Sequence, residues 1–144
     1  MLNEKVYYQL KKLYDNSQKI SISDNDRFVI FSDLHMGNGG ANDDFLKNAY
    51  LFDYVLNNYY LPRSYKLILN GDVEELYKFS IKSIEKKWKN VYNTFDLFSE
   101  HTGLYKIVGN HDHLLYSLNN STHNYLLLES LKLDYNGNDI FIYH

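Results

Sequence analysis

Residues 28–37 read Phe28-Val29-Ile30-Phe31-Ser32-Asp33-Leu34-His35-Met36-Gly37, and this stretch decides the fold. Its first four residues are apolar, and a short apolar run bounded by polar residues predicts a β-strand. Asp33 and His35 follow, two positions apart, where the strand ends. A carboxylate and an imidazole so placed can turn toward one ion, and both are ligands of divalent metals. The stretch therefore predicts a strand that opens onto a metal site.

Two later stretches repeat this pattern. Leu67-Ile68-Leu69-Asn70 runs into Gly71-Asp72-Val73-Glu74-Glu75, and Tyr105-Lys106-Ile107-Val108 runs into Gly109-Asn110-His111-Asp112. Adjacent parallel strands bring their carboxyl ends to one edge of a sheet, which is where α/β domains usually bind ligands. We therefore expect the three polar segments to converge.

The composition limits the function classes. The chain has 144 residues, which predicts one domain, and its formal net charge of −3 argues against general binding to nucleic acid or anionic membranes. Cysteine is absent, which excludes disulfides and thiolate metal sites and leaves histidine, carboxylate and amide ligands. No apolar segment approaches the ~20 residues of a membrane span, and the polar residues from Asn3 onward argue against a signal peptide. We expect a cytoplasmic protein.

Hydrophobic periodicity predicts helices and strands in alternation around the polar segments. A helix from 42 to 58 joins the strand at 27–31 to a strand at 65–69, and a helix from 81 to 101 leads into a strand at 104–108. These two crossovers predict an α/β fold. Elsewhere we expect an N-terminal helix from 4 to 14 within an appendage of residues 1–20, a lead-in strand and turn at 21–26, a short helix at 113–118, a loop at 119–122, and strands at 126–133 and 140–143 around an Asn136-Gly137 turn.

Asp33-x-His35, Gly71-Asp72-x-x-Glu75 and Gly109-Asn110-His111-Asp112 follow one another in this order along the chain. One such block alone occurs by chance in many proteins. Together the three resemble the first three blocks of the calcineurin-like metallophosphoesterase superfamily, and the resemblance covers about residues 27 to 144. It implies an α/β fold that is the N-terminal portion of an α/β/β/α sandwich, with a central mixed sheet flanked by helices.

The resemblance also implies a set of metal ligands. Two divalent metal ions (Mn, Fe, Zn or Mg) would form a dinuclear centre in which Asp33 and His35 hold one ion, Asn110 helps to hold the other, and Asp72 bridges them. The family's fourth block is a histidine at the end of a β-strand, and His144 fits that pattern. Independently of the family, hard oxygen and imidazole ligands suit these metals.

His111 resembles the family's general acid, which donates to the leaving oxygen, and Glu75 would orient it in place of the usual aspartate. The implied function is an enzyme that hydrolyses a phosphomonoester or phosphodiester substrate by attack of a metal-bound hydroxide. Glu75 and the long helix before the third block look more like the UDP-diacylglucosamine hydrolase branch than like the protein serine/threonine phosphatases. The latter carry an arginine after the acidic residue, where this chain has Leu76.

Structural interpretations of the same residues stay open. Asp33 and Asp72 could cap turns after strands, His35 could be a partly buried core histidine, and Asn110 could hold a left-handed turn. Asp112 is better explained as a helix cap or a support of the ligands than as a ligand itself.

The family's fifth block, Gly-His-x-His, has no counterpart in the 144 residues. We therefore expect a C-terminally incomplete domain that binds metal weakly, has low activity and self-associates through an exposed sheet surface. The alternative function is a non-catalytic remnant or a protein-binding module on the same fold. A nuclease is a third class, which the low basic charge disfavours.

Overall fold

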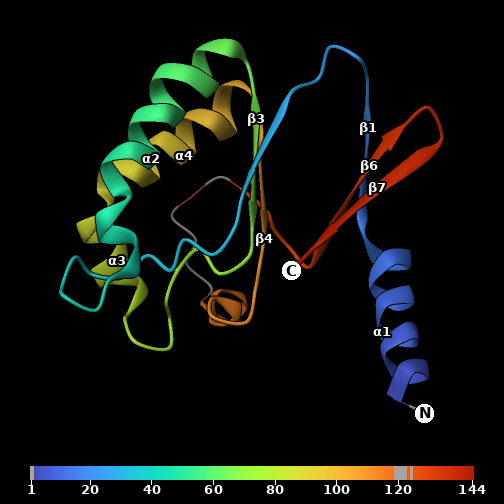
Figure 1. Ribbon diagram of the computed structural model, residues 1–144, viewed down its shortest axis with the longest axis horizontal. Coiled ribbons are helices and arrows are strands. Elements are labelled where there is room, and N and C mark those ends of the chain that lie inside the picture. Colours follow the sequence, from blue (N-terminus) through green and yellow to red (C-terminus); the bar gives the residue numbers. More distant parts are fainter. Residues whose placement is uncertain (1, 119–122, 124) are drawn as a thin grey trace.

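The computed structural model describes residues 2–118, 123 and 125–144 and has an α/β fold (Figure 1). The expected loop at 119–122 lies outside the described residues. In chain order the elements are α1 (Leu2–Asn16), β1 (Gln18–Ile22), β2 (Phe28–Phe31), the 3₁₀-helix η1 (Asp44–Lys47), α2 (Ala49–Val55), the π-helix η2 (Leu56–Tyr60), the 3₁₀-helix η3 (Leu61–Arg63), β3 (Lys66–Asn70), α3 (Ile81–Lys87), α4 (Lys89–His101), β4 (Leu104–Ile107), the 3₁₀-helix η4 (His113–Ser117), β5 (Leu127–Leu128), β6 (Ser130–Tyr135) and β7 (Asn138–Tyr143).

The described strands form two sheets. β2, β3, β4 and β5 make a four-stranded sheet in that order, and each neighbouring pair is parallel. β1, β6 and β7 make a three-stranded sheet, in which β1 is parallel to β6 and β7 is antiparallel to it. The α/β class with mixed strand pairing and flanking helices is confirmed. The mixed pairing lies in the second sheet, while the sheet that carries the three polar segments is wholly parallel.

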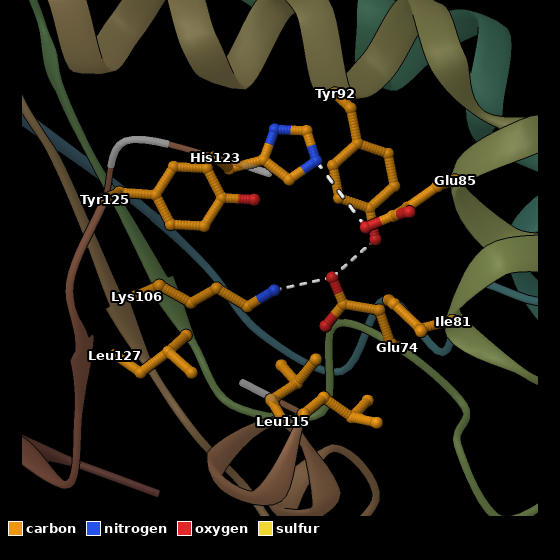
Figure 2. Close-up of a pocket in the computed structure, with 10 residues that line it drawn as sticks. Glu74, Ile81, Glu85, Tyr92, Lys106, Leu115, His123, Tyr125 and Leu127 are labelled. Carbon is orange, nitrogen blue, oxygen red and sulfur yellow. Dashed lines mark hydrogen bonds and ion pairs between the residues drawn. The ribbon is translucent and has the colours of Figure 1, made fainter. Parts of the chain in front are cut away.

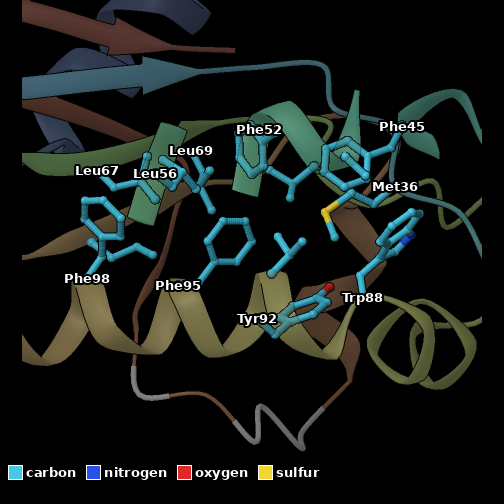
Figure 3. Packing of buried hydrophobic residues seen from close by; sticks show 14 of the residues in the cluster. Met36, Phe45, Phe52, Leu56, Leu67, Leu69, Trp88, Tyr92, Phe95 and Phe98 are labelled. Carbon is cyan, nitrogen blue, oxygen red and sulfur yellow. The ribbon is translucent and has the colours of Figure 1, made fainter. Parts of the chain in front are cut away.

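Successive residues of β3 point to opposite faces of the parallel sheet and so separate two cores. Leu67 and Leu69 face α2 and α4, where they join a large cluster of buried aromatic and aliphatic side chains (Figure 3). Phe95 and Phe98 of α4 are fully buried in that cluster, and burial of each such side chain stabilises the fold by about 1.5–3 kcal/mol.

Ile68 faces the other way, toward the second sheet. There it packs with Ile107 of β4 and with Leu131, Leu133 and Ile142 of β6 and β7. The molecule therefore has a helical layer, a parallel sheet and a mixed sheet in succession, and the carboxyl ends of β2, β3 and β4 lie at the same edge of the middle layer.

Both long predicted helices are divided. The segment expected to be helical from 42 to 58 starts with η1, which Asp43 caps through a hydrogen bond from the Phe45 amide, and it ends in the π-helical turn η2. The segment from 81 to 101 breaks at Trp88, whose backbone leaves the helical region at φ −104° and ψ 31°. The Trp88 indole N–H donates to the Gly37 carbonyl at 2.8 Å, so the break lets α3 and the Gly37 loop meet.

The two ends of the chain differ from expectation by a few residues. Gln18–Ile22 forms β1 and pairs with β6, so residues 18–20 belong to the second sheet rather than to the N-terminal appendage. The predicted strand at 126–133 is interrupted at Glu129, where the chain passes from β5 in one sheet to β6 in the other. The hairpin turn is confirmed, with Asn136 and Gly137 at φ 52° and 82°. Within the described residues, no helix has the length and apolar character needed to cross a membrane.

Candidate metal centre

The loops after β2, β3 and β4 are joined to one another by backbone hydrogen bonds. The amides of Asp33 and His35 donate to the carbonyls of Gly71 and Asp72 at 3.1 and 3.0 Å. The Gly71 amide in turn donates to the Ile107 carbonyl at 2.9 Å. The parallel register of the strands therefore continues past their ends, and the polar segments converge as the sequence predicts.

Three of the predicted ligands have left-handed backbone conformations. Asp33, His35 and Asp72 have φ values of 54°, 48° and 53°. Such values are uncommon for residues other than glycine, and conformations of this kind cluster at functional sites when the surrounding structure imposes them. At this edge of the sheet the loop bonds impose them, and the carboxylates and the imidazole are held there at a cost in backbone energy.

Two glycines allow the loops to approach closely. A Cβ atom built on Gly109 would lie 2.3 Å from Asp72 Oδ1 and 2.7 Å from the Asp72 backbone nitrogen. A Cβ atom on Gly71 would lie 2.2 Å from Cγ of the His144 ring. All three distances are far below ordinary contact, so these positions require glycine for the site to assemble.

The carboxylate of Asp72 lies at the centre of the site. It is buried, with Oδ1 accepting a hydrogen bond from the His111 amide at 2.9 Å and Oδ2 lying 3.3 Å from His144 Nε2. Asp33, His35 and Asp72 each offer one ligand atom, and these atoms lie within 4.8 Å of one another. Asp72 therefore contacts groups from the other two loops and from the end of β7.

Glu75 joins two histidines on the other side of the site. Its buried carboxylate lies 2.9 Å from His111 Nδ1 and 3.3 Å from His35 Nδ1, and Lys78 Nζ is 3.7 Å away. Burial raises the pKa of Glu75, but the hydrogen bond from His111 and the neighbouring positive charges outweigh burial and lower it. The same hydrogen bond raises the pKa of His111, so this imidazole keeps its proton to higher pH than a free histidine.

The donor groups suit a divalent cation. His35, Glu75 and His111 form a second group of ligand atoms within 4.8 Å of one another, and this group shares His35 with the first. In the described part of the chain, His35 Nδ1 is buried and makes no hydrogen bond of ordinary geometry, although Glu75 Oε2 lies 3.3 Å away, and such a polar atom is rare in a folded protein. Carboxylates and imidazoles in close proximity are the ligand types that Mn, Fe and Zn accept.

The structure brings most of the predicted residues together. Asp33, His35 and His144 lie near the Asp72 carboxylate, and Glu75 contacts His111 as expected for a group that orients it. Asn110 lies exposed in the same loop, where its carbonyl oxygen contacts His113 Nδ1 at 2.8 Å. A role for the Asn110 carboxamide as a ligand stays a prediction.

Two aspartates support the site in a way that the sequence patterns did not reveal in full. Asp112 is fully buried, and its two oxygens accept hydrogen bonds from the amides of Val73 at 2.8 Å and Gly109 at 2.6 Å. Burial raises its pKa. Asp43 likewise accepts from the amides of Gly37 and Gly39. An aspartate close to glycines is the available sequence signal, but the sequence does not indicate which backbone amides the aspartate will bind.

The site is defined by these contacts and by the order of the three polar segments along the chain. A scan against protein-family models and a search of the curated proteins find no match to this chain.

Proposed function

We propose that this chain is a metallophosphoesterase domain of the calcineurin-like type, which binds two divalent metal ions and hydrolyses a phosphomonoester or a phosphodiester. The observation that carries the proposal is the surroundings of the Asp72 carboxylate: it shares a group of close ligand atoms with Asp33 and His35, and its Oδ2 lies 3.3 Å from His144 Nε2. A carboxylate offers two oxygens, so it can bridge two ions.

The chemistry of the remaining groups supports the same proposal. Bound divalent ions neutralise charge on the phosphoryl oxygens and activate water for attack. Asp33, His35, Asp72, Asn110 and His144 are the residues that would hold them. His111 is suited to donate a proton to the leaving oxygen, because Glu75 holds its Nδ1 and raises its pKa, and Nε2 remains for the substrate.

The layer order supports the finer fold assignment. Helices, a parallel sheet and a mixed sheet follow one another, which is compatible with the first three layers of the α/β/β/α sandwich. In this fold the three loops at the carboxyl edge of the middle layer would carry the metal ligands. The substrate would then approach from that edge.

The test is metal binding by this chain and its dependence on Asp72. Titration calorimetry with Mn²⁺ is compared for the wild-type chain, Asp72→Asn and the matched control Asp53→Asn, which changes a carboxylate that bonds Asn57 and Thr94 away from the site. We expect Asp72→Asn to weaken Mn²⁺ binding by at least about tenfold and Asp53→Asn to leave it unchanged.

Hydrolysis is assayed in parallel with p-nitrophenyl phosphate and bis(p-nitrophenyl) phosphate. Manganese-dependent release of nitrophenol that Asp72→Asn abolishes supports the enzyme. Metal binding without hydrolysis of either ester supports the non-catalytic module, and absence of metal binding by the wild-type chain contradicts the proposal as a whole.

A further inference from the structure

Glu74 precedes Glu75 in the loop after β3, but its side chain points into the protein rather than toward the metal centre. The Glu74 carboxylate is fully buried, and Oε1 accepts hydrogen bonds from Lys106 Nζ at 2.5 Å and from the Tyr92 hydroxyl at 2.7 Å (Figure 2). Lys106 is 2% exposed. Burial and the charge of Glu74 raise the pKa of Tyr92, so its hydroxyl remains a donor.

The cavity beside these groups is too small for a substrate. Glu74, Lys106, Tyr92 and Tyr125 line a space of about 40 Å³, whereas pockets for small-molecule ligands have volumes of roughly 300–1,000 Å³. The polar groups in Figure 2 therefore need an explanation other than binding of a phosphoester.

The explanation lies in which segments the three side chains connect. The backbone of Glu74 pairs with Met36: the Met36 amide donates to the Val73 carbonyl at 2.8 Å, and the Glu75 amide donates to the Met36 carbonyl at 3.1 Å. Met36 directly follows His35 in the loop after β2. The backbone of this segment thus links the first and second loops of the metal centre.

The side chain of Glu74 links strand β4 and the helical layer. Lys106 belongs to β4, the strand that leads into Asn110 and His111, and Tyr92 belongs to α4. Through its backbone and its carboxylate together, the Glu74 segment therefore connects the loops after β2 and β3 with the strand before the third loop and with the helix that covers the sheet.

Burial of an ion pair carries a desolvation cost that can exceed the attraction between its two charges. Replacement of such a pair by apolar side chains of similar volume is often neutral or stabilising, whereas loss of one partner strongly destabilises. Lys106 and Tyr92 both bond Oε1 of Glu74, and in the described part of the chain Oε2 is buried without a hydrogen-bond partner. Stability alone thus gives little reason for charges here, while directional bonds can fix the relative positions of the loops.

We infer that Glu74, Lys106 and Tyr92 form a positioning triad that sets the geometry of the metal-binding loops. The inference rests on the proposed function, because its main consequence is metal affinity. Glu74 acts through Asp72 and Glu75, its neighbours in the loop, and Lys106 acts through the strand that carries His111. The triad does not touch the metals or the substrate.

The decisive variant replaces both charges with apolar groups. Glu74→Leu combined with Lys106→Met removes the ion pair without leaving a lone buried charge, and urea unfolding checks that the fold keeps its stability. We expect this double variant to bind Co²⁺ about 10–100-fold more weakly than wild type, with an altered Co²⁺ visible spectrum. A double variant with the wild-type affinity and spectrum overturns the inference and makes the pair a structural element only.

A milder pair of variants covers the case in which the double variant does not fold. Tyr92→Phe removes one hydrogen bond to Glu74 and is expected to weaken Co²⁺ binding about three- to tenfold. Tyr125→Phe removes a hydroxyl from the same cavity, leaves both Glu74 bonds in place, and is expected to bind Co²⁺ like wild type. Equal affinities for these two variants overturn the inference.

A measurement without metal separates this inference from the proposed function. Amide hydrogen exchange of Met36 and Glu75, whose N–H groups bond across the first two loops, is followed in metal-free protein. We expect exchange at both amides to be at least about tenfold faster in the Tyr92→Phe variant than in Tyr125→Phe. Failure of wild type to bind Co²⁺ contradicts the proposed function, whereas unchanged exchange contradicts the triad.

Discussion

Substitution of Gly109 by alanine tests the close approach of the loops on which the proposed metal centre depends. The new Cβ atom would lie 2.3 Å from Asp72 Oδ1 and 2.7 Å from the Asp72 backbone nitrogen. The side-chain oxygen could rotate away, but the backbone nitrogen cannot move without shifting the loop after β3. Gly109 does not have a positive φ, so crowding alone determines the effect.

The magnitude follows from what must move. An added methyl group that forces the backbone to shift in a well-packed region destabilises the folded state by about 1–3 kcal/mol. We expect Gly109→Ala to lower the free energy of unfolding by that amount. Because the shift displaces Asp72 itself, metal affinity should fall together with stability. Gly40→Ala is the matched control: Gly40 also lacks a positive φ, and among the residues that the structure describes its added Cβ would meet only the Asn38 side-chain oxygen, at 3.1 Å.

Urea unfolding followed by circular dichroism gives the free energies, and calorimetry with Mn²⁺ gives the affinities. Gly40→Ala should be neutral or slightly stabilising, since alanine restricts the unfolded chain more than glycine does. If Gly109→Ala unfolds at the same urea concentration as Gly40→Ala, Gly109 does not contact Asp72 in solution, and the assembly of the site described above is refuted.

Three further outcomes are expected. Asp112→Asn should lower the unfolding free energy by about 1–3 kcal/mol, because its new N–H₂ group faces amide donors, yet should retain more metal after dialysis than Asp72→Asn; equal retention would contradict the bridging role of Asp72. His111→Asn should leave metal stoichiometry unchanged and slow turnover by roughly 10²–10⁴-fold, and loss of metal would instead make His111 a ligand. The hydrogen bond from Lys66 lowers the pKa of Asp26 to about 2, so its stabilisation is present above the unfolded pKa near 4 and is lost as pH falls through 2. Urea unfolding between pH 4 and pH 2 should therefore show a loss of about 1 kcal/mol in wild type that Asp26→Asn lacks.

The features that sequence could predict depend on local information. Each of the three polar segments follows an apolar run, and the strand, its end and the ligand types are all encoded within about ten residues. Parallel pairing of the strands is then enough to bring the three segments to one edge of the sheet. Asp33, Asp72 and His111 could therefore be expected in one site. The Asn136-Gly137 turn is equally local, because both positions need positive φ.

The features that escaped prediction depend on contacts between distant residues. The helix break at Trp88 accompanies a bond from its indole to Gly37, a residue of another loop, and the periodicity of the helix continues through the break. From the sequence, a lysine within a strand is expected to point into solvent. Lys106 is instead buried, and its ion pair with Glu74, a residue distant in the sequence, explains that burial. The change of sheet at Glu129 depends on which strands are already paired.

The left-handed conformations of Asp33, His35 and Asp72 set stability and chemistry against each other. Glycine at any of these three positions would relax the backbone, which releases on the order of 1 kcal/mol or more for each. A programme of directed evolution that selects only for heat resistance would therefore drift toward glycine at these positions and erase the donor groups. On the proposed function, the most thermostable descendants of this protein would be the ones least able to hold a metal, and a screen for such variants needs a metal-dependent signal from its first round.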